Sequence, residues 1–187
     1  CPGYQCFHGY ACGDVYFIKT DANGNSIKEK KIETSYSTQG IKLEALADGN
    51  LIAGGTIKEG RRQPVNSAMW KLNTAGDVLW EWKGTAKKVG NVFHQERVNS
   101  LIISADGNSA TGTGYIKQSN GNGYTDFIVW TVNTANGQTD WTKRYEMPAS
   151  QYANSILMLN PETYLLVGPR HYLKIKSSDG TMLESLK

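Results

Sequence analysis

One hairpin-like segment occurs more than once in this chain, and its repetition constrains the fold more than any other feature. The sequence KLEALADGNLIAGG at 42–55 is matched by NSLIISADGNSATGTG at 99–114. A more divergent copy, NSILMLNPETYLLVG, lies at 154–168. Each copy consists of an apolar run, a turn sequence and a second apolar run, and this pattern predicts a β-hairpin.

A second hairpin-like segment recurs between these copies. MWKLNTAGDVLWEW at 69–82 aligns with VWTVNTANGQTDW at 129–141, and weaker copies lie at 15–31 and 172–185. All of them share an alternating apolar run followed by a turn of Asn, Asp, Thr, Ser or Gly. Asn and Asp tolerate left-handed backbone, and Gly lacks the Cβ that would clash there, so these residues favour tight turns.

Together the two hairpins make units of four short strands, which we expect at about 40–83, 98–144 and 153–186. The segment 1–33 contributes a partial unit, in which 3–10 is expected to be a further strand. Four short antiparallel strands that recur about every 50 residues are typical of a β-propeller blade. We therefore predict an all-β fold, a single β-propeller domain or part of one, with about 3.5–4 blades in this chain.

The hairpins also resemble those of known propellers. ADGNLIAGG at 47–55 resembles the inner hairpin of bacterial propeller repeats found in large surface and secreted proteins. KLNTAGDVLWEW and VNTANGQTDW resemble the outer hairpin of quinoprotein-type propellers, in which a strand-borne tryptophan docks one blade on the next. The resemblance implies this docking role for Trp80 and Trp141, whereas Lys28 and Glu184 stand at the equivalent positions of the other units. It implies the fold more strongly than the function, because propellers have many functions.

The number of blades raises a question of closure. Closed rings usually have about 4–8 blades, and an open ring leaves strand edges exposed. A small four-bladed ring, a piece of a longer propeller, and a ring completed by a partner are the three solutions. The missing innermost strand of the first unit favours the last two, so the expected partners are a protein or the remaining blades of a larger propeller.

Three cysteines lie near the start of the sequence. Cys6 and Cys12 are close enough to form a disulfide in an oxidising compartment, which leaves Cys1 over. A bacterial lipoprotein begins its mature chain at a lipidated cysteine, and the alternative is an arbitrary cut. We therefore expect an extracytoplasmic protein, at the cell surface or outer membrane, in the periplasm or secreted. Any membrane attachment would be through a lipid on Cys1, since no apolar run reaches the roughly 18–20 residues that span a bilayer.

Charge and motifs argue against several other functions. The net charge of +3 is spread along the chain, so we expect no nucleic-acid partner. His8, His94 and His171 are too scattered to be metal ligands, and the cysteine spacing matches no zinc knuckle. DANGN at 21–25 has the spacing of a calcium loop, but Ile32 stands where the bidentate Glu is required, so we interpret it as a turn. We predict no metal, no cofactor and no catalytic residue.

The irregular loops are the candidate binding region. In a meander, the loops that follow the second and fourth strands lie at the opposite end from the tight turns, and here they are long and irregular. Basic and aromatic residues in them suit an acidic peptide, a glycan or a protein partner, although solvated loops with local packing are the alternative. The residues predicted to share this face are Arg61, Arg62, Phe93, His94, Arg97, Tyr124, Tyr152, Arg170 and His171.

Two classes of function follow from this pattern. The first is a non-catalytic binding or assembly scaffold of a bacterial surface or secreted protein, which in the lipoprotein form is a subunit of an envelope complex. The second is a fragment of a carbohydrate-active or quinoprotein-like propeller enzyme. Glycan recognition through Tyr124 or Phe93 is a further alternative. Carboxylates clustered near the ring axis would indicate an enzyme, and Glu44 is the only one we expect on the inner strands, which favours binding.

Overall fold

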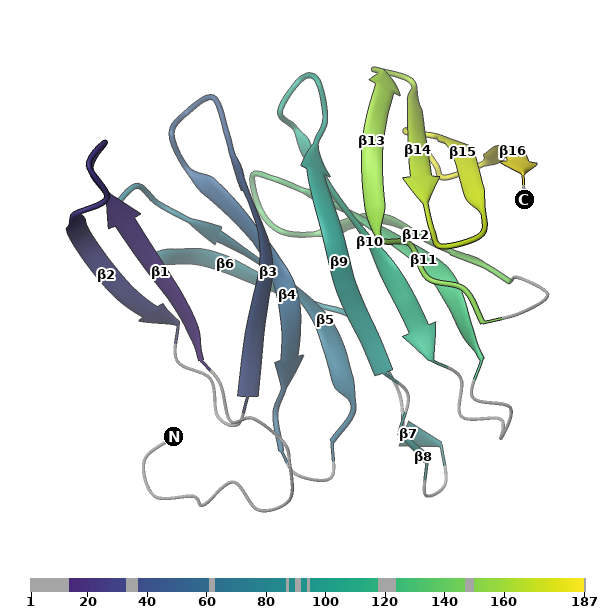
Figure 1. The fold of residues 1–187 in the computed structure, drawn as a ribbon, viewed down its shortest axis with the longest axis horizontal. Helices are drawn as coiled ribbons and strands as arrows, with labels where there is room; N and C mark the ends of the chain where they lie inside the picture. The colour runs from purple at the N-terminus through teal and green to yellow at the C-terminus, as the bar shows by residue number, and fades with distance from the viewer. Residues whose placement is uncertain are drawn as a thin grey trace.

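The computed structural model describes residues 14–32, 37–60, 63–86, 88–89, 92–93, 95–117, 124–146 and 150–186. The regular secondary structure in these ranges consists of β-strands, and the sheets are antiparallel apart from a single parallel pairing of Val65 with Gln95. The expectation of an all-β fold built from antiparallel strands is therefore confirmed (Figure 1).

The strands form a two-stranded hairpin followed by three four-stranded meanders and one minor pair. The N-terminal hairpin is β1 (Val15–Thr20) and β2 (Ser26–Ile32). The first meander is β3 (Ser37–Ala45), β4 (Leu51–Lys58), β5 (Val65–Leu72) and β6 (Val78–Lys83). The second is β9 (Gln95–Ile103), β10 (Ser109–Lys117), β11 (Thr125–Asn133) and β12 (Thr139–Tyr145). The third is β13 (Ser155–Asn160), β14 (Thr163–Val167), β15 (Tyr172–Lys176) and β16 (Met182–Leu186). The minor pair is β7 (Lys88–Val89) and β8 (Val92–Phe93).

The repetition seen in the sequence extends to the backbone of the first two meanders. The turns of β3–β4 and β9–β10 each hold a glycine in the left-handed region, Gly49 at φ 83° and Gly107 at φ 76°. Both hairpins also have a bulge, opposite Gly55 in one and Gly114 in the other. A Cβ at either glycine would clash with the carbonyl oxygen of the bulged strand, so the same residue type is required at both places.

The DANGN segment is a hairpin turn, as expected. It joins β1 to β2, and the Asp21 carboxylate accepts hydrogen bonds from the backbone N–H groups of Asn23 and Asn25, both at 2.9 Å. The side-chain amide of Asn25 donates a third, also at 2.9 Å. These local bonds occupy the carboxylate within its own turn and lower its pKa.

The hairpin and the meanders pack in a row, with β3, β9 and β13 as the first strands of their meanders (Figure 1). The pairing of β5 with β9 joins the first two meanders into one eight-stranded sheet. A separate hydrophobic cluster lies at each junction. Phe17 and Ile32 of the hairpin pack against Trp70 of the first meander. The first meander contributes Met69 to its cluster with the second, and the second contributes Phe127 to its cluster with the third. Burial of these apolar faces is the main force that holds the row together.

At each junction an aromatic side chain also packs on the turn between the third and fourth strands of the following meander, which we call its outer turn. Trp80 lies against Gly137 and Trp141 against Gly180, and a Cβ on these glycines would stand 2.8 and 2.7 Å from the indole carbons. The docking role that the resemblance implied for Trp80 and Trp141 is therefore borne out at these two junctions. At the first junction the nearest side chains to a Cβ on Gly76 are those of Phe17 on β1, at 2.8 Å, and Lys30 on β2, at 3.2 Å, rather than that of Lys28, which aligns with the tryptophans.

Within the described residues the sheets do not close on themselves. The N-terminal hairpin stands at one end of the row and the third meander at the other (Figure 1). Both ends present apolar side chains to solvent. Tyr16 and Ile18 are exposed on the face of β1 opposite Phe17, and Leu157 and Leu159 are exposed on β13.

Candidate functional site

The connections between strands divide between the two ends of the sheets (Figure 1). The tight turns within the hairpins lie at the upper end in this view. The β4–β5, β10–β11, β12–β13 and β14–β15 connections lie at the lower end, as does the β7–β8 pair. We call this lower end the loop face. It comprises the described parts of these connections, at 59–60, 63–64, 124, 146, 150–154 and 168–171, and the first residues of β9.

Segment 150–154 organises the loop face, because it runs along the ends of β10 and β11. The N–H of Gln151 donates a 2.7 Å hydrogen bond to the carbonyl of Thr125, and the N–H of Ala153 donates one of 3.1 Å to Gly114. The Ser150 hydroxyl accepts from the N–H of Thr125 at 3.1 Å. Tyr124 and Tyr152, two of the predicted binding residues, are thus held near each other, and both side chains are exposed.

Arg97 belongs to the same region through a residue that the sequence did not single out. Tyr115 on β10 pairs directly with Arg97 on β9, and its ring meets the ring of Tyr152 edge to face, with centroids 6.3 Å apart. Within the described residues, Nε of Arg97 is buried without a hydrogen-bond partner. The structure therefore aligns a guanidinium and two aromatic rings, a combination suited to acidic or aromatic groups of a ligand.

Arg170 and His171 lie on the adjacent β14–β15 loop. Gly168 donates a 2.9 Å hydrogen bond to the carbonyl of His171, and a Cβ at Gly168 would stand 2.6 Å from the carbonyl oxygen of Tyr152. This loop is therefore packed against segment 150–154. Arg170 is exposed, whereas neither ring nitrogen of His171 has a hydrogen-bond partner among the described residues.

Several predicted residues lie outside the part of the chain that the structure describes. They are Arg61, Arg62 and His94 of the binding set, the side chain of Phe93, the disulfide pair Cys6 and Cys12, and the lipidation candidate Cys1. The expected strand at 3–10 falls there too. Their roles remain predictions from the sequence.

Glu96 is a buried carboxylate that the sequence interpretation missed. The expectation that Glu44 is the only carboxylate of the inner strands is wrong, because β9 begins at Gln95 and includes Glu96, which is 3% exposed. Burial raises the pKa of Glu96 to about 7, although a hydrogen bond from the backbone of Ser67 lowers it. Its Oε2 has no hydrogen-bond partner in the described residues. The sequence did not show where β9 begins, because strand boundaries are the least predictable part of an element. Glu96 lies next to an irregular loop, and its neighbours show no alternation that would assign it to the strand.

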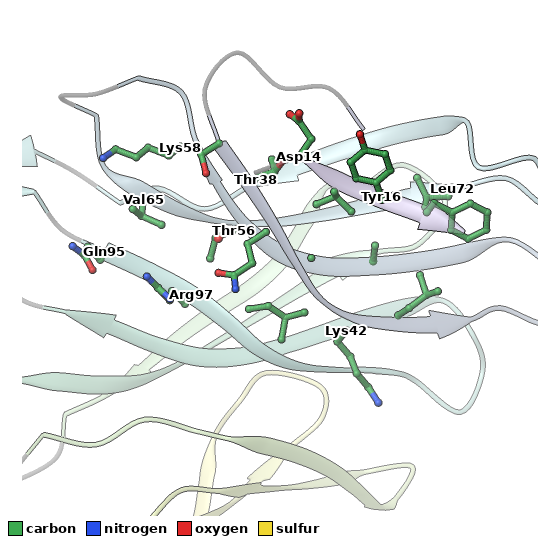
Figure 2. Close-up of a pocket in the computed structure, with 18 residues that line it drawn as sticks. Asp14, Tyr16, Thr38, Lys42, Thr56, Lys58, Val65, Leu72, Gln95 and Arg97 are labelled. Carbon is green, nitrogen blue, oxygen red and sulfur yellow. The ribbon is translucent and has the colours of Figure 1, made fainter. Parts of the chain in front are cut away.

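A groove of about 830 Å³ lies between β1 and β3, away from most of the predicted residues (Figure 2). Its floor is the face of the first meander, including Ala53 and Leu72. Figure 2 shows Tyr16 and Leu72 at one end and Gln95 and Arg97 at the other. Among the members of the predicted binding set that the structure describes, Arg97 alone lines this groove.

Two further observations concern the described residues alone. Nowhere in them do three or more His, Cys, Asp or Glu side chains come together in a way that could hold a metal ion. They also contain no helix with the length and hydropathy needed to cross a bilayer.

Comparison of the sequence with models of known protein families and with curated proteins finds no match.

Proposed function

We propose that this chain is a β-propeller-type module of a bacterial surface or secreted protein and acts without catalysis as a binding or assembly scaffold. One observation carries the proposal. Repeated four-stranded meanders stack face to face, and the row ends on both sides in sheet faces with exposed apolar residues. Such faces are typical of surfaces that are covered in the assembled protein.

The two end faces are made in the same way as the internal junctions. On β13, Ile156 and Met158 face the second meander, while Leu157 and Leu159 alternate to the other side. Leu157 pairs with Leu165 across the sheet, which extends the apolar surface onto β14. This face supports the stacking of a further sheet, either another blade or a partner protein. The loop face would then remain accessible for a ligand.

The size of the native assembly tests the scaffold proposal. We expect the protein in the cells that produce it to elute in an assembly well above 20.6 kDa, and in a smaller one when Leu157 and Leu159 are both replaced by Lys. Leu79→Lys on β6 is the matched control, because Leu79 is equally exposed but lies on an outer strand of the first meander. A native protein that elutes at 20.6 kDa, or a double variant with unchanged assembly, would contradict the proposal.

Glycan binding by the loop face is the second candidate function, because Tyr124, Tyr152 and Arg170 are all exposed there. Saturable binding on a glycan array that is lost in Tyr124→Ala and Tyr152→Ala would support this role. Leu79→Ala is the control, since Leu79 lies away from the loop face. Turnover of a bound glycan would instead favour the enzyme alternative.

A further inference from the structure

A pair of tyrosines presents an aromatic surface on the loop face. The ring of Tyr152 meets the ring of Tyr115 on β10, with centroids 6.3 Å apart and an angle of 64° between the ring planes. Tyr152 is 39% exposed, so part of this pair is accessible from solvent. Tyr124, which is 50% exposed, adds a third ring to the same end of the sheets. Aromatic side chains that combine an apolar ring with a polar hydroxyl group are common in binding surfaces.

An arginine is adjacent, along the backbone, to each member of this pair. Arg97 on β9 pairs directly with Tyr115. Arg170 lies in the β14–β15 loop, two residues after Gly168, and a Cβ on Gly168 would stand 2.6 Å from the carbonyl oxygen of Tyr152. Arg170 is exposed to solvent. The structure therefore brings two cationic side chains to the part of the loop face that holds the aromatic pair.

Neither of these arginines is paired with a carboxylate of the described residues. Among the described side chains Arg144 has ion pairs, with Asp126 and Glu146, whereas no ion pair joins Arg97 or Arg170 to an acidic group. Within the same residues, the Nε of Arg97 is buried without a hydrogen-bond partner. Buried donors are nearly always satisfied in folded proteins. The positive charge of this cluster is therefore not balanced by the described part of the chain.

Glu96, the acidic residue next to Arg97 in the sequence, does not neutralise this charge. Successive residues of a strand point to opposite faces of the sheet, so Glu96 and Arg97 lie on different faces of β9. The carboxylate of Glu96 lies against Gly84 and Ser67 of the first meander and is 3% exposed. It is therefore directed away from the aromatic pair and shielded from any ligand bound there.

The backbone of segment 150–154 is already occupied by hydrogen bonds. The N–H groups of Gln151, Ala153 and Asn154 donate to carbonyl oxygens of β11, β10 and β14, at 2.7, 3.1 and 2.8 Å. An extended peptide binds a sheet mainly through backbone hydrogen bonds, and these donors are not available to it. Recognition at this place therefore depends on side chains, which the hydrogen-bonded segment holds in preformed positions. This favours a glycan over an acidic peptide as the ligand.

We propose that this part of the loop face binds an acidic glycan, in which a sugar ring packs on Tyr152 and its carboxylate is bound by Arg170. The inference rests on the glycan binding proposed above as the second candidate function, and it names the class of glycan. A tyrosine ring offers an apolar face to the C–H groups of a sugar. The planar guanidinium donates two parallel hydrogen bonds to a carboxylate. Arg97 adds positive charge nearby, which favours an anionic ligand over a neutral one.

The ligand class is tested by removing the charge from the glycan itself. The full chain is applied to an array of uronate-containing, sialylated, sulfated and neutral glycans, and the best carboxylate-containing ligand is then titrated by calorimetry. Chemical reduction of its carboxylates to alcohols keeps the sugar rings and removes only the charge. We expect this reduction to weaken binding about tenfold or more. Raising the salt concentration should also weaken binding of the acidic form, because solvent-exposed charges are screened.

Two variants separate the roles of charge and ring. Arg170→Met should weaken binding of the acidic glycan about tenfold and leave binding of the reduced glycan unchanged, since only the acidic form uses the guanidinium. Tyr152→Ala should weaken binding of both forms, because each loses the ring contact. Lys28→Met, at an exposed cation of β2, is the matched control and should change neither. An unchanged midpoint of thermal unfolding in Arg170→Met shows that this variant is folded.

Several outcomes would overturn the inference. Equal binding of the acidic glycan and its reduced form would refute it and leave glycan binding by the loop face intact. Binding of sulfated neutral glycans or of polyglutamate as tightly as the carboxylate-containing glycan would also refute it, as would unchanged affinity in both Arg170→Met and Tyr152→Ala. Absence of binding to every glycan on the array would refute the second candidate function itself, so the two failures are distinguishable.

Discussion

The indole N–H of Trp80 donates a 3.0 Å hydrogen bond to the carbonyl oxygen of Thr134, which lies in the outer turn of the next meander. The indole ring also covers Gly137 of that turn. Trp80 therefore joins the first two meanders both by a directional hydrogen bond and by apolar contact. Trp141 covers Gly180 in the same way at the following junction. Because these contacts recur, the stacking of the units is specified at each junction rather than by a single core.

The glycines under these rings should be sensitive to any added side chain. Gly137 has φ 72°, and a Cβ there would stand 2.8 Å from the indole of Trp80. Gly24 has φ 84°, and nothing lies within 4 Å of its Cβ position. Left-handed backbone alone costs a non-glycine residue about 1–2 kcal/mol. We expect Gly24→Ala to lower the free energy of unfolding by this amount. Gly137→Ala should lower it by about 2 kcal/mol more, because the ring of Trp80 must also move.

Urea unfolding of both glycine variants checks this expectation. The difference between them removes the backbone contribution, which is common to the two. Equal losses of unfolding free energy would mean that the ring of Trp80 does not rest on the turn.

The free energy of unfolding should decrease as the pH rises, because Glu96 is buried. The folded pKa of about 7 is above the ordinary value of 4.5, so between these two pH values the folded protein retains a proton that the unfolded chain has released. The free energy of unfolding therefore decreases as the pH rises from about 4.5 to about 7, by about 3 kcal/mol in total, and this contribution is constant above pH 7.

Glu96→Gln tests the assignment. The amide cannot ionise, so the variant should lose this part of the pH dependence and be more stable than the wild type at pH 8. Glu44→Gln is the control, since Glu44 lies on β3 beside Lys42 at 3.0 Å and is partly exposed. Chemical denaturation across pH 4–8 measures both. An unchanged slope in Glu96→Gln would assign the effect to another group.

Leu101 and Leu43 stand at matching positions of the repeated hairpin, but their different burial predicts unequal costs for the same truncation. Leu101→Ala opens a cavity at the junction of the first two meanders and should cost about 2–5 kcal/mol. Leu43→Ala removes a side chain that is already half exposed and should cost less than about 1 kcal/mol. Thermal unfolding of the free chain distinguishes the two. A large loss for Leu43→Ala would show that this side chain is covered in solution.

The ion pair of Arg144 with Asp126 should contribute more to stability than that of Lys174 with Glu184. Nη2 of Arg144 lies 2.6 Å from Oδ2 of Asp126, whose side chain is only 5% exposed. Arg144→Met removes two charged hydrogen bonds, from Nε and Nη2, to this buried carboxylate, and we expect a loss of about 2 kcal/mol in the free energy of unfolding. Lys174→Met breaks a pair that is well exposed on both sides, so its effect should be clearly smaller and should vanish in high salt.

The salt dependence of unfolding is the deciding measurement for these two variants. An equal loss of unfolding free energy in Arg144→Met and Lys174→Met would show that burial of Asp126 does not strengthen its ion pair.

The strands and turns were predictable from the sequence because their signals are local. Alternation of apolar residues and the Asp-Gly and Asn-Gly turns depend on backbone sterics over a few residues, so β3–β4 and β9–β10 follow from their own segments. The aligned tryptophans also identified two docking contacts correctly. At the first junction the alignment failed, because Phe17 of β1 performs the docking there and not a residue at the aligned position on β2.

The candidate site was predictable only in part. The sequence predicted that Tyr124, Tyr152, Arg170 and His171 share one end of the sheets, because connectivity alone decides which loops share an end. Hydrogen bonds and close contacts of segment 150–154 with Thr125 and Gly168 place these loops together. The sequence did not identify Tyr115, because its contact with Tyr152 joins residues that are far apart in the chain and follows from no repeat or alternation. Glu96 was missed for a similar reason, since its burial depends on Gly84 and Ser67 of the first meander.

The repeating unit, an antiparallel arrangement of short strands joined by glycine turns, follows from the sequence, since it depends on local sterics and on alternation. Which faces of the strands are covered depends instead on how the units pack. Leu43 and Leu101 have the same side chain in the same repeat position, yet one is exposed and the other buried. Burial is a property of the neighbouring sheet, and the unit before β3 has two described strands where the others have four.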